Sequence, residues 1–481
     1  MTVDVHDDVH IGGRWVRSNS SARLDVVDPA TEQVYAQVPD GDAVDIDRAV
    51  VAARSAFRGW AATPAADRAS ILRAFADELE RRNDSLSLLL TRENGSPVAE
   101  TGAAGSHAAA QLRYYADLTA GVEDEIRAYP PGVSAETVVR RLPAGVAGLI
   151  TPWNYPLGLV MTKLAPALMA GCTTVIKPAP ETPLHVRPLM DAAAAAGVPD
   201  GVINVVTGGG ATGAALVEHP DVDKIAFTGS TATGKLIGAT CGSLLRSVTL
   251  ELGGKSAAVL LDDADLDLFA RSVVRLSMRN SGQTCYACTR VLAPQPRYDE
   301  IVDRIVDAVR AARQGDPLDP ATVFGPVVSQ RQRERVEGYV EIGSQEGAKL
   351  VTGGGRPVHL DHGYYVSPTV FRDVTAEMRI AQEEIFGPVL SVLPYDDVDD
   401  AVRIANDSRY GLGGAVFGVD EERAQQVAER IETGNIGVNF YASNHAAPFS
   451  GRKDSGVGVE FGPEGLAAYQ VFQSVHRKKA S

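Results

Sequence analysis

Short apolar runs alternate with helical segments from Val146 to Thr228, and this alternation constrains the fold more than any other feature of the chain. The four runs are rich in Val, Ile and Thr and cover residues 146–150, 173–177, 202–206 and 224–228. Runs of this length, separated by helix-length segments, are typical of buried parallel strands joined by crossover helices. The sequence therefore predicts an α/β fold with a doubly wound sheet, which binds ligands at the carboxyl ends of its strands.

A second α/β region is expected after Gly254. Its expected strands cover residues 256–261, 287–292, 389–393, 414–417 and 435–439, and its expected helices cover 299–314 and 331–346. Ahead of the first region, the Ala-rich segments 45–82 and 98–122 have charged residues at the spacing of exposed helix positions. A chain of 481 residues is too long for one hydrophobic core, so at least two domains are expected.

The composition argues against several classes of protein. A net charge of -15 is unsuited to the basic face that binds nucleic acid. No apolar run reaches the roughly 18–20 residues that a membrane span requires, and the acidic residues 1–8 contain no signal-peptide core. Four cysteines are too few for a disulfide framework in a chain of this size. We therefore expect a reducing compartment, the cytoplasm.

Two short segments contain the residues that point to chemistry. Cys285 follows Gly-Gln-Thr, and Glu251 is followed by Leu-Gly-Gly. A cysteine between small residues is a candidate nucleophile, and a carboxylate beside glycines is a candidate base with room for a ligand. The alternatives are an inert buried thiol and a solvated surface carboxylate. Zinc binding by Cys285 and Cys288 is a further alternative, but no second Cys or His pair lies near them in the sequence, and no metal is expected.

The two segments resemble the signature elements of the aldehyde dehydrogenase superfamily, Glu-Leu-Gly-Gly-Lys and Gly-Gln-x-Cys. Further matching segments occur in family order over nearly the whole chain, at residues 151–156, 177–178, 227–230, 384–388 and 448–456. The resemblance implies oxidation of an aldehyde to a carboxylic acid with NAD(P)+. It implies that Cys285 attacks the carbonyl, Asn154 stabilises the oxyanion, and Glu251 activates the water that releases the acid from a thioester.

The resemblance also implies a cofactor site. The residues expected there are Thr151, Pro152, Trp153, Lys177, Gly213, Phe227, Gly229, Ser230, Glu251, Leu252, Gly253, Glu384 and Phe386. The segment 208–213 matches the dinucleotide pattern G-x-G-x-x-G, but in the family the corresponding turn is mainly structural, and the phosphates meet the turn at 227–234. That turn also fits on physical grounds, because Ser230 begins a helix whose free N–H groups attract phosphate.

The cofactor is expected to be NAD, with NADP possible. Family members that prefer NAD often have Glu three residues after the lysine that corresponds to Lys177, but Pro180 occupies that position here. No arginine close in the sequence is placed to bind the 2'-phosphate of NADP, which favours NAD.

The family pattern divides the chain into three parts. Residues 1–122 and 144–252 are expected to form the NAD(P)-binding domain, 253–452 the catalytic domain, and 123–143 with 453–481 an oligomerisation segment. In the family, a hairpin near 123–143 pairs with the C-terminal tail of a neighbouring subunit. A homodimer or homotetramer is therefore expected.

The substrate is less defined by the sequence. Relatives line the substrate tunnel near Tyr155, Thr162, Thr284, Tyr286 and Phe440. No arginine or carboxylate stands among these residues, so a neutral aliphatic or aromatic aldehyde is expected. Two other functions remain open at this point: a non-catalytic member of the fold that binds or scaffolds, and a cofactor-free thiol hydrolase. Retention of Glu251 argues against a relative that transfers the acyl group to coenzyme A.

Overall fold

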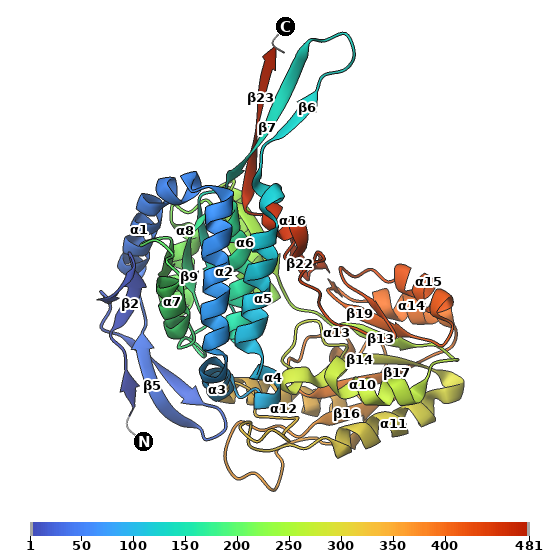
Figure 1. The fold of residues 1–481 in the computed structure, drawn as a ribbon. Coiled ribbons are helices and arrows are strands. Elements are labelled where there is room, and N and C mark those ends of the chain that lie inside the picture. Colours follow the sequence, from blue (N-terminus) through green and yellow to red (C-terminus); the bar gives the residue numbers. More distant parts are fainter. Residues whose placement is uncertain (1–2, 479–481) are drawn as a thin grey trace.

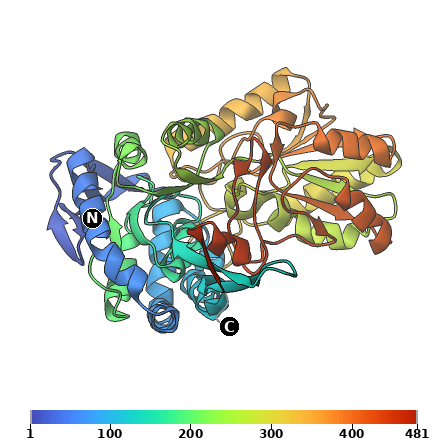
Figure 2. The same cartoon turned by 90° about the horizontal axis from the view of Figure 1, so that it is seen from above.

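The computed structural model describes residues 3–478, so the first two and last three residues of the expected domains lie outside it. Two α/β bodies lie side by side, and a narrow β-ribbon projects from the first of them (Figure 1). The view from above separates the N-terminal body from the body formed by residues after 253 (Figure 2). No helix in the described part of the chain is long and apolar enough to cross a membrane.

The first body is built on an eight-stranded sheet. The spatial order is β22 (Gly456–Val457), β12 (Ser247–Glu251), β11 (Lys224–Thr228), β8 (Val146–Ile150), β9 (Thr173–Lys177), β10 (Ile203–Val205), β2 (Asp8–Ile11) and β3 (Arg14–Arg17). The strands from β12 to β10 are all parallel. The chain runs outward from β8 through β9 to β10, then returns to β11 on the other side of β8. The crevice between β8 and β11 is therefore the switch point at which such sheets bind ligands.

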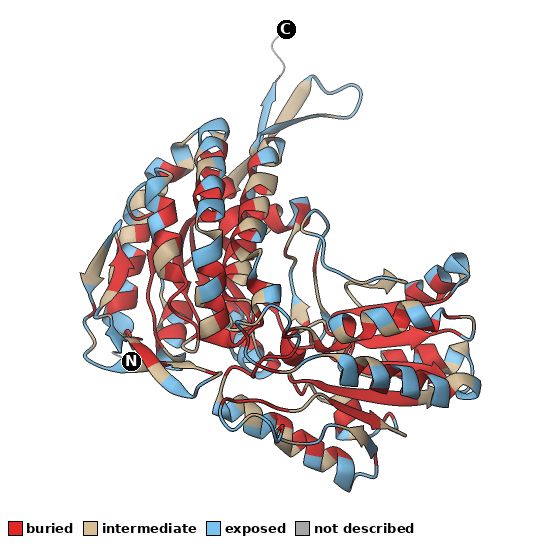
Figure 3. Cartoon of the chain, turned by 60° about the horizontal axis from the view of Figure 1, so that its bottom comes forward, coloured by how far each residue is buried: buried red, intermediate tan, exposed pale blue. Residues whose placement is uncertain are grey.

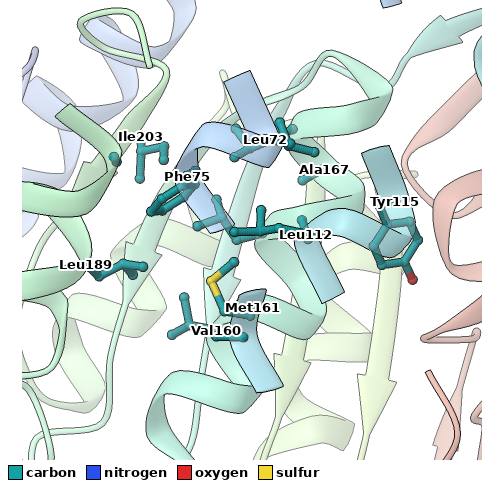
Figure 4. Close-up of a cluster of buried hydrophobic side chains, with 14 of the residues drawn as sticks. Leu72, Phe75, Leu112, Tyr115, Val160, Met161, Ala167, Leu189 and Ile203 are labelled. Carbon is teal, nitrogen blue, oxygen red and sulfur yellow. The ribbon is translucent and has the colours of Figure 1, made fainter. Parts of the chain in front are cut away.

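Helices cover both faces of this sheet. They are α1 (Ala43–Ala62), α2 (Ala65–Arg81), α3 (Asn83–Asn94), α4 (Val98–Thr101), α5 (Ala104–Asp117), α6 (Pro156–Ala170), α7 (Val186–Ala195), α8 (Gly210–Glu218), α9 (Thr231–Ser243) and α16 (Gly462–Ala467). On one face, α2, α5, α6 and α7 enclose a core in which Phe75, Leu112, Met161 and Leu189 pack together (Figure 4). On the other face, Ile46, Val50 and Leu216 of α1 and α8 pack against the sheet.

The second body contains a seven-stranded sheet. Its order is β15 (Lys349–Thr352), β16 (Thr369–Arg372), β17 (Val389–Tyr395), β14 (Arg290–Pro294), β13 (Ala257–Leu260), β19 (Gly414–Phe417) and β20 (Gly437–Val438). Its helices are α10 (Leu266–Met278), α11 (Tyr298–Ala311), α12 (Gln330–Gln345), α13 (Arg379–Gln382), α14 (Val398–Asn406) and α15 (Glu421–Glu429). The five inner strands are buried, the edge strands β15 and β20 are not, and the helices alternate between buried and exposed positions (Figure 3).

Shorter elements complete the structure. Strands β1 (Asp4–Val5), β4 (Arg23–Asp28) and β5 (Gln33–Pro39) form a small sheet, and β18 (Tyr410–Gly411) pairs with β21 (Arg452–Lys453). The 3₁₀ turns are η1 (Thr119–Val122), η2 (Arg279–Gly282) and η3 (Gln295–Arg297).

The projecting ribbon corrects one expectation. It consists of β6 (Glu125–Ala128), β7 (Ala135–Pro143) and β23 (Gln470–Lys478), with β7 in the middle. We expected β7 to pair with the C-terminal tail of a neighbouring subunit, and this expectation is wrong. Strand β7 pairs with β23 of the same chain, from Pro143–Gln470 to Ala135–Lys478. Both edges of β7 are therefore paired, and among residues 3–478 the outer edges of β6 and β23 have no further strand partner.

The expected strands and helices agree closely with the structure in the first body and less closely elsewhere. Strands 146–150, 173–177, 224–228 and 414–417 match. The expected helix 45–82 is two helices, because Pro64 has no N–H to donate and α1 stops at Ala62. The expected strand 287–292 begins only at Arg290, because the residues before it form the turn that holds Cys285.

Candidate active site

A cavity of about 440 Å³ lies between the two bodies. It is lined by Pro152, Trp153, Asn154, Thr228, Gly229, Ser230, Leu252, Gly253, Cys285, Arg331, Gln332, Arg335, Glu384 and Phe386. The loops that follow β8, β11 and β12 form one wall at the switch point of the first sheet. The loops that precede β14 and β17 bring Cys285 and Glu384 from the second sheet to the opposite wall. Segments that are distant in the sequence thus meet because carboxyl ends of one sheet face amino ends of the other.

The turn before Cys285 is held in an unusual backbone conformation. Asn280, Ser281 and Gly282 all have positive φ, at 53°, 52° and 76°. A side chain at Gly282 would place Cβ 2.0 Å from the carbonyl oxygen of Gly387, so only glycine fits there. The Ser281 hydroxyl donates to the Gly325 carbonyl at 2.8 Å. These contacts fix the turn, and strain of this kind is stored where a reactive group is positioned.

Cys285 is a half-buried free thiol whose pKa is raised to about 12. Burial is the main cause, and the negative charges of Glu384 and Glu251 add to it. Backbone N–H groups of Tyr286 and Cys285 itself act in the opposite direction. The thiol is therefore protonated at neutral pH in the cofactor-free protein. Cys288, by contrast, is fully buried and outside the cavity lining.

Asn154 is 3% exposed and is tied into the same turn. Its side-chain Nδ2 donates to the Gln283 carbonyl at 2.9 Å. Its backbone carbonyl accepts from the side chains of Asn94 at 3.2 Å and Asn280 at 2.9 Å. One N–H of the Asn154 amide remains to donate into the cavity beside Cys285.

Glu251 ends β12 and is 3% exposed. Neither of its carboxylate oxygens has a hydrogen-bond partner within residues 3–478. Burial and the neighbouring carboxylate of Glu460 raise the pKa of Glu251 well above its usual value, and the ammonium of Lys163 opposes them. Lys163 is itself fully buried and bonds Glu460 Oε1 at 2.7 Å and Thr228 Oγ1 at 2.6 Å. An unpaired buried carboxylate with a raised pKa is suited to general base catalysis.

Glu384 and two aromatic rings lie on the cavity wall. Glu384 accepts a hydrogen bond from the Gly254 N–H at 3.1 Å, and burial raises its pKa to about 6. The rings of Trp153 and Phe386 meet edge to face with centroids 5.3 Å apart. A Cβ on Gly253 would lie 2.7 Å from Glu384 Oε2, so the loop after β12 has to pass close to this carboxylate.

The remaining predicted cofactor residues lie outside the cavity lining, at neighbouring strand ends. Thr151 and Phe227 are buried at the ends of β8 and β11. Lys177 ends β9, and its ammonium donates to the carbonyls of Pro178 at 2.7 Å and Gly208 at 2.8 Å. Burial lowers the pKa of Lys177 to about 8. Gly213 faces the Lys177 stem, where a Cβ would lie 3.5 Å from Cδ.

The G-x-G-x-x-G turn at 208–213 makes its hydrogen bonds within the protein. The Gly209 N–H donates to Asp40 Oδ1 at 2.8 Å, and the Gly213 N–H donates to the Gly209 carbonyl at 3.2 Å. The expectation that this turn is mainly structural stays a prediction.

The predicted substrate residues are spread over three places. The hydroxyls of Tyr155 and Thr284 share a hydrogen bond of 2.6 Å beside the cysteine turn, and the Tyr286 ring packs edge to face on Phe449. Thr162 is buried, where it donates to the Gly158 carbonyl and to Gln111. Phe440 is 69% exposed and lines a separate surface hollow.

A smaller cavity of about 90 Å³ adjoins the first at Asn154. Tyr155, Gly158, Glu100 and Arg279 are among its lining residues. The predicted substrate residues themselves include no arginine or carboxylate, but the fold brings Arg279 and Glu100 beside them. The pairing of Arg279 with Glu100, 179 residues earlier, depends on the fold.

The sequence also did not reveal the part played by α12. Arg331, Gln332 and Arg335 reach the main cavity from the first turns of this helix. Arg331 lies 3.8 Å from Glu181, so an arginine does approach the segment after Lys177, although none is close in sequence. The pattern of a polar amphipathic helix gives no signal that distinguishes these residues from ordinary exposed positions.

Comparison with known proteins identifies the family. The family model described as "Aldehyde dehydrogenase family" matches residues 15–475. The chain belongs to the aldehyde dehydrogenase family. It is 50% identical over 480 residues to geranial dehydrogenase of Castellaniella defragrans, covering 99% of both chains. It is 41% identical over 468 residues to 3-succinoylsemialdehyde-pyridine dehydrogenase of a Pseudomonas species, covering 97% of both.

Solved structures agree with this assignment. An aldehyde dehydrogenase of Mycobacterium tuberculosis in complex with NAD+ superposes with a TM-score of 0.95, at 44% identity and 98% coverage of both chains. A variant of aldehyde dehydrogenase C from Pseudomonas syringae, in complex with NAD+ and octanal, gives 0.94 at 40% identity, covering 98% of this chain and 96% of the other. The predicted family and fold class are confirmed, and the protein is an aldehyde dehydrogenase.

Proposed function

We propose that this enzyme oxidises an aldehyde to a carboxylic acid with NAD+, using Cys285 as nucleophile, Asn154 as oxyanion donor and Glu251 as base. The observation that carries the proposal is the shared cavity. Cys285 and Asn154 line it together with the Gly229–Ser230 turn and Glu384, and Glu251 lies next to the lining residue Leu252. A cofactor-free hydrolase has no use for such a combination of nucleophile and dinucleotide-type turn.

The cavity fits a dinucleotide on physical grounds. Ser230 caps the 13-residue helix α9, whose first N–H groups face the switch point and attract phosphate. Glu384 offers a carboxylate for ribose hydroxyls, and Arg331 and Arg335 add positive charge. Gln332 and Arg335 are proposed as further cofactor contacts. When bound, NAD+ accepts a hydride from the substrate carbon, so that aldehyde, NAD+ and water become acid, NADH and a proton.

The other predicted cofactor residues extend this site toward the adenosine end. Thr151, Lys177, Gly213 and Phe227 lie at or beside the ends of strands in the first sheet. We propose that residues 1–122 and 144–252 hold the cofactor while 253–452 supply the nucleophile.

Cys285 supplies the bond to the substrate. Its sulfur attacks the carbonyl carbon as the thiolate, and the thiol proton passes to solvent as the proton released in the overall reaction. The free N–H of the Asn154 side chain and the backbone N–H of Cys285 hold the oxyanion. One such donor is typically worth about 3–4 kcal/mol of the barrier. Loss of hydride from this thiohemiacetal leaves an acyl group as a thioester on Cys285.

Glu251 acts when the acid is released. Its unpartnered oxygens take a proton from a water molecule that attacks the thioester, which frees the acid and restores the thiol. The raised pKa of Glu251 makes its carboxylate a stronger base and favours transfer of the proton from water.

Comparison also supports NAD+ over NADP+, because two structural relatives were solved with NAD+ bound. The Arg331 side chain is 87% exposed and forms an ion pair with Glu181. It is therefore a weak candidate to bind the 2'-phosphate of NADP. The open edges of β6 and β23 support a homodimer or homotetramer, and the low cysteine content supports a cytoplasmic location.

The relatives named for geranial and for 3-succinoylsemialdehyde-pyridine, and the complex with octanal, support a medium-chain or conjugated aldehyde as substrate.

Absorbance at 340 nm with NAD+ or NADP+ and an aldehyde panel tests the proposal, with Cys285→Ala as control. NADH formation that requires Cys285 is expected. Equal activity of the Cys285→Ala variant, or no reduced cofactor with any aldehyde, would contradict the proposed function.

A further inference from the structure

The small cavity beside Asn154 is lined by a half-buried charged pair that the proposed chemistry does not use. Arg279 Nε donates to Glu100 Oε2 at 2.6 Å, and the two side chains are only 22% and 24% exposed. Glu100 comes from α4 and Arg279 from the turn that follows α10. Partial burial of two charges carries a desolvation free energy, and the attraction between the charges offsets only part of it. A hydrophobic pair would fill this space at lower cost.

The cavity is positioned to hold the tail of the substrate. Asn154, whose amide is expected to meet the aldehyde oxygen, lines both cavities, and Tyr155, Gly158 and Arg279 line the smaller one. Gly158 offers no side chain to block this route. A substrate whose carbonyl carbon lies at Cys285 can therefore extend its tail toward the guanidinium.

The guanidinium retains donors for a ligand. It has five N–H groups. Within the described residues one donates to Glu100. Burial raises the pKa of the nearby Tyr286 hydroxyl and the positive charge of Arg279 lowers it, and the guanidinium carbon lies 5.8 Å from the centroid of the Tyr155 ring. The other N–H groups are free to meet an acceptor in the cavity.

We infer that Arg279 determines specificity by binding a neutral hydrogen-bond acceptor, such as an ether, ketone or ring nitrogen, on the tail of the aldehyde. This inference rests on the proposed function and names the substrate class of the same site. Glu100 already neutralises Arg279, so a tail carboxylate would bring a second negative charge beside Glu100. A neutral acceptor fills a free donor without adding charge.

Arg279 also contributes to local structure, because its backbone carbonyl accepts from the Thr284 hydroxyl at 3.2 Å. A purely structural role predicts that loss of the side chain affects all aldehydes alike. A specificity role predicts that the loss depends on the tail. The decisive quantity is therefore a ratio between substrates, which cancels any general loss of activity.

The test compares octanal with octanals in which an ether oxygen replaces one methylene at carbon 5, 6 or 7. kcat and KM are measured with NAD+ for the wild type, Arg279→Met, Arg279→Lys and Arg279→Met/Glu100→Gln. The wild type is expected to prefer the best ether over octanal by about tenfold in kcat/KM, which is the size of one hydrogen bond to a charged donor. Both Met variants are expected to lose this preference through KM, and Lys to retain part of it.

Two matched controls sharpen the result. Arg275→Met removes an exposed arginine one turn earlier on α10 and is expected to leave the ratio unchanged. The aldehyde with a terminal carboxylate is expected to be a poorer substrate than octanal for the wild type and to improve in Glu100→Gln.

NADH formation from octanal, with the same ether-to-octanal ratio in the wild type and Arg279→Met, would overturn this inference alone. Preference of the wild type for the carboxylate aldehyde over octanal would also overturn it. No NADH from any aldehyde would overturn the proposed function as well.

Discussion

Replacement of Lys163 by methionine is expected to destabilise the first body strongly. Lys163 is fully buried and contacts Glu460 at 2.7 Å and Thr228 at 2.6 Å, while the Glu460 side chain is 7% exposed. Methionine preserves most of the packing volume but leaves the Glu460 carboxylate buried without its cation. Breaking a buried pair in this way costs about 3–5 kcal/mol, whereas replacing both partners by apolar residues is often close to neutral. The double variant Lys163→Met/Glu460→Leu should therefore recover most of the loss.

Urea unfolding followed by tryptophan fluorescence measures this effect where it occurs. All three tryptophans, Trp15, Trp60 and Trp153, lie in the first body with the ion pair. Lys235→Met is the matched control, because Lys235 pairs with Asp454 at 2.8 Å with its own side chain 59% exposed. Such a surface pair is worth about 1 kcal/mol or less.

The reasoning would be refuted if Lys163→Met lost no more stability than the Lys235 control. It would also be refuted if the double variant lost as much as the single one. A kinetic consequence follows for Glu251, because Lys163 lowers the pKa of this base. Without that cation the pKa rises further, so the acidic limb of the kcat profile should move to higher pH.

Three further predictions concern the turn that carries the thiol. Gly282→Ala should lower kcat by about a hundredfold or more, because its Cβ would collide with the Gly387 carbonyl and displace Cys285. Gly338→Ala is the control, because Gly338 lies on α12 with open space around it and its replacement should leave kcat unchanged. A loss of kcat in this control would show that the effect is general. Alkylation of Cys285 by iodoacetamide in the cofactor-free enzyme should rise about tenfold per pH unit between about pH 7 and 10, since the thiolate fraction grows toward a pKa of about 12; a plateau near pH 8 would contradict this pKa. Glu384→Gln should speed the same alkylation at pH 8 by a factor of a few, because it removes a charge that raises the thiol pKa, and an unchanged or slower rate would show that this charge does not act on the sulfur.

Much of the fold and the reacting residues could be predicted from sequence because local signals carry them. The strands that end at Ile150, Lys177 and Thr228 are continuous apolar runs, and their ends define the sheet edge that binds ligands. The segments around Cys285 and Glu251 carry short, specific motifs. The resemblance of these motifs to the family's signature elements, together with the strand pattern, predicted that they belong to one site.

The remaining features depend on contacts between distant segments. The positive φ of Ser281 has no sequence signature, because the contacts that hold this turn come from distant segments: Ser281 bonds the Gly325 carbonyl, and Gly282 lies against Gly387. Arg279 is an ordinary charged residue in the sequence and becomes informative only when Glu100 lies beside it. The partner of β7 is likewise decided by which strand reaches its edge, and strand character alone does not separate the chain's own tail from that of a neighbour.

Trapping the acyl enzyme tests the central claim most directly. The Glu251→Gln variant, mixed with octanal and NAD+, is quenched and analysed by NADH absorbance and by mass spectrometry of the intact protein and its peptides. We predict one equivalent of NADH per active site, an octanoyl group on Cys285, and steady-state turnover reduced by about 10²–10⁴ because the general base is missing. Turnover at the wild-type rate, or NADH formation with no acyl group on Cys285, would contradict the account.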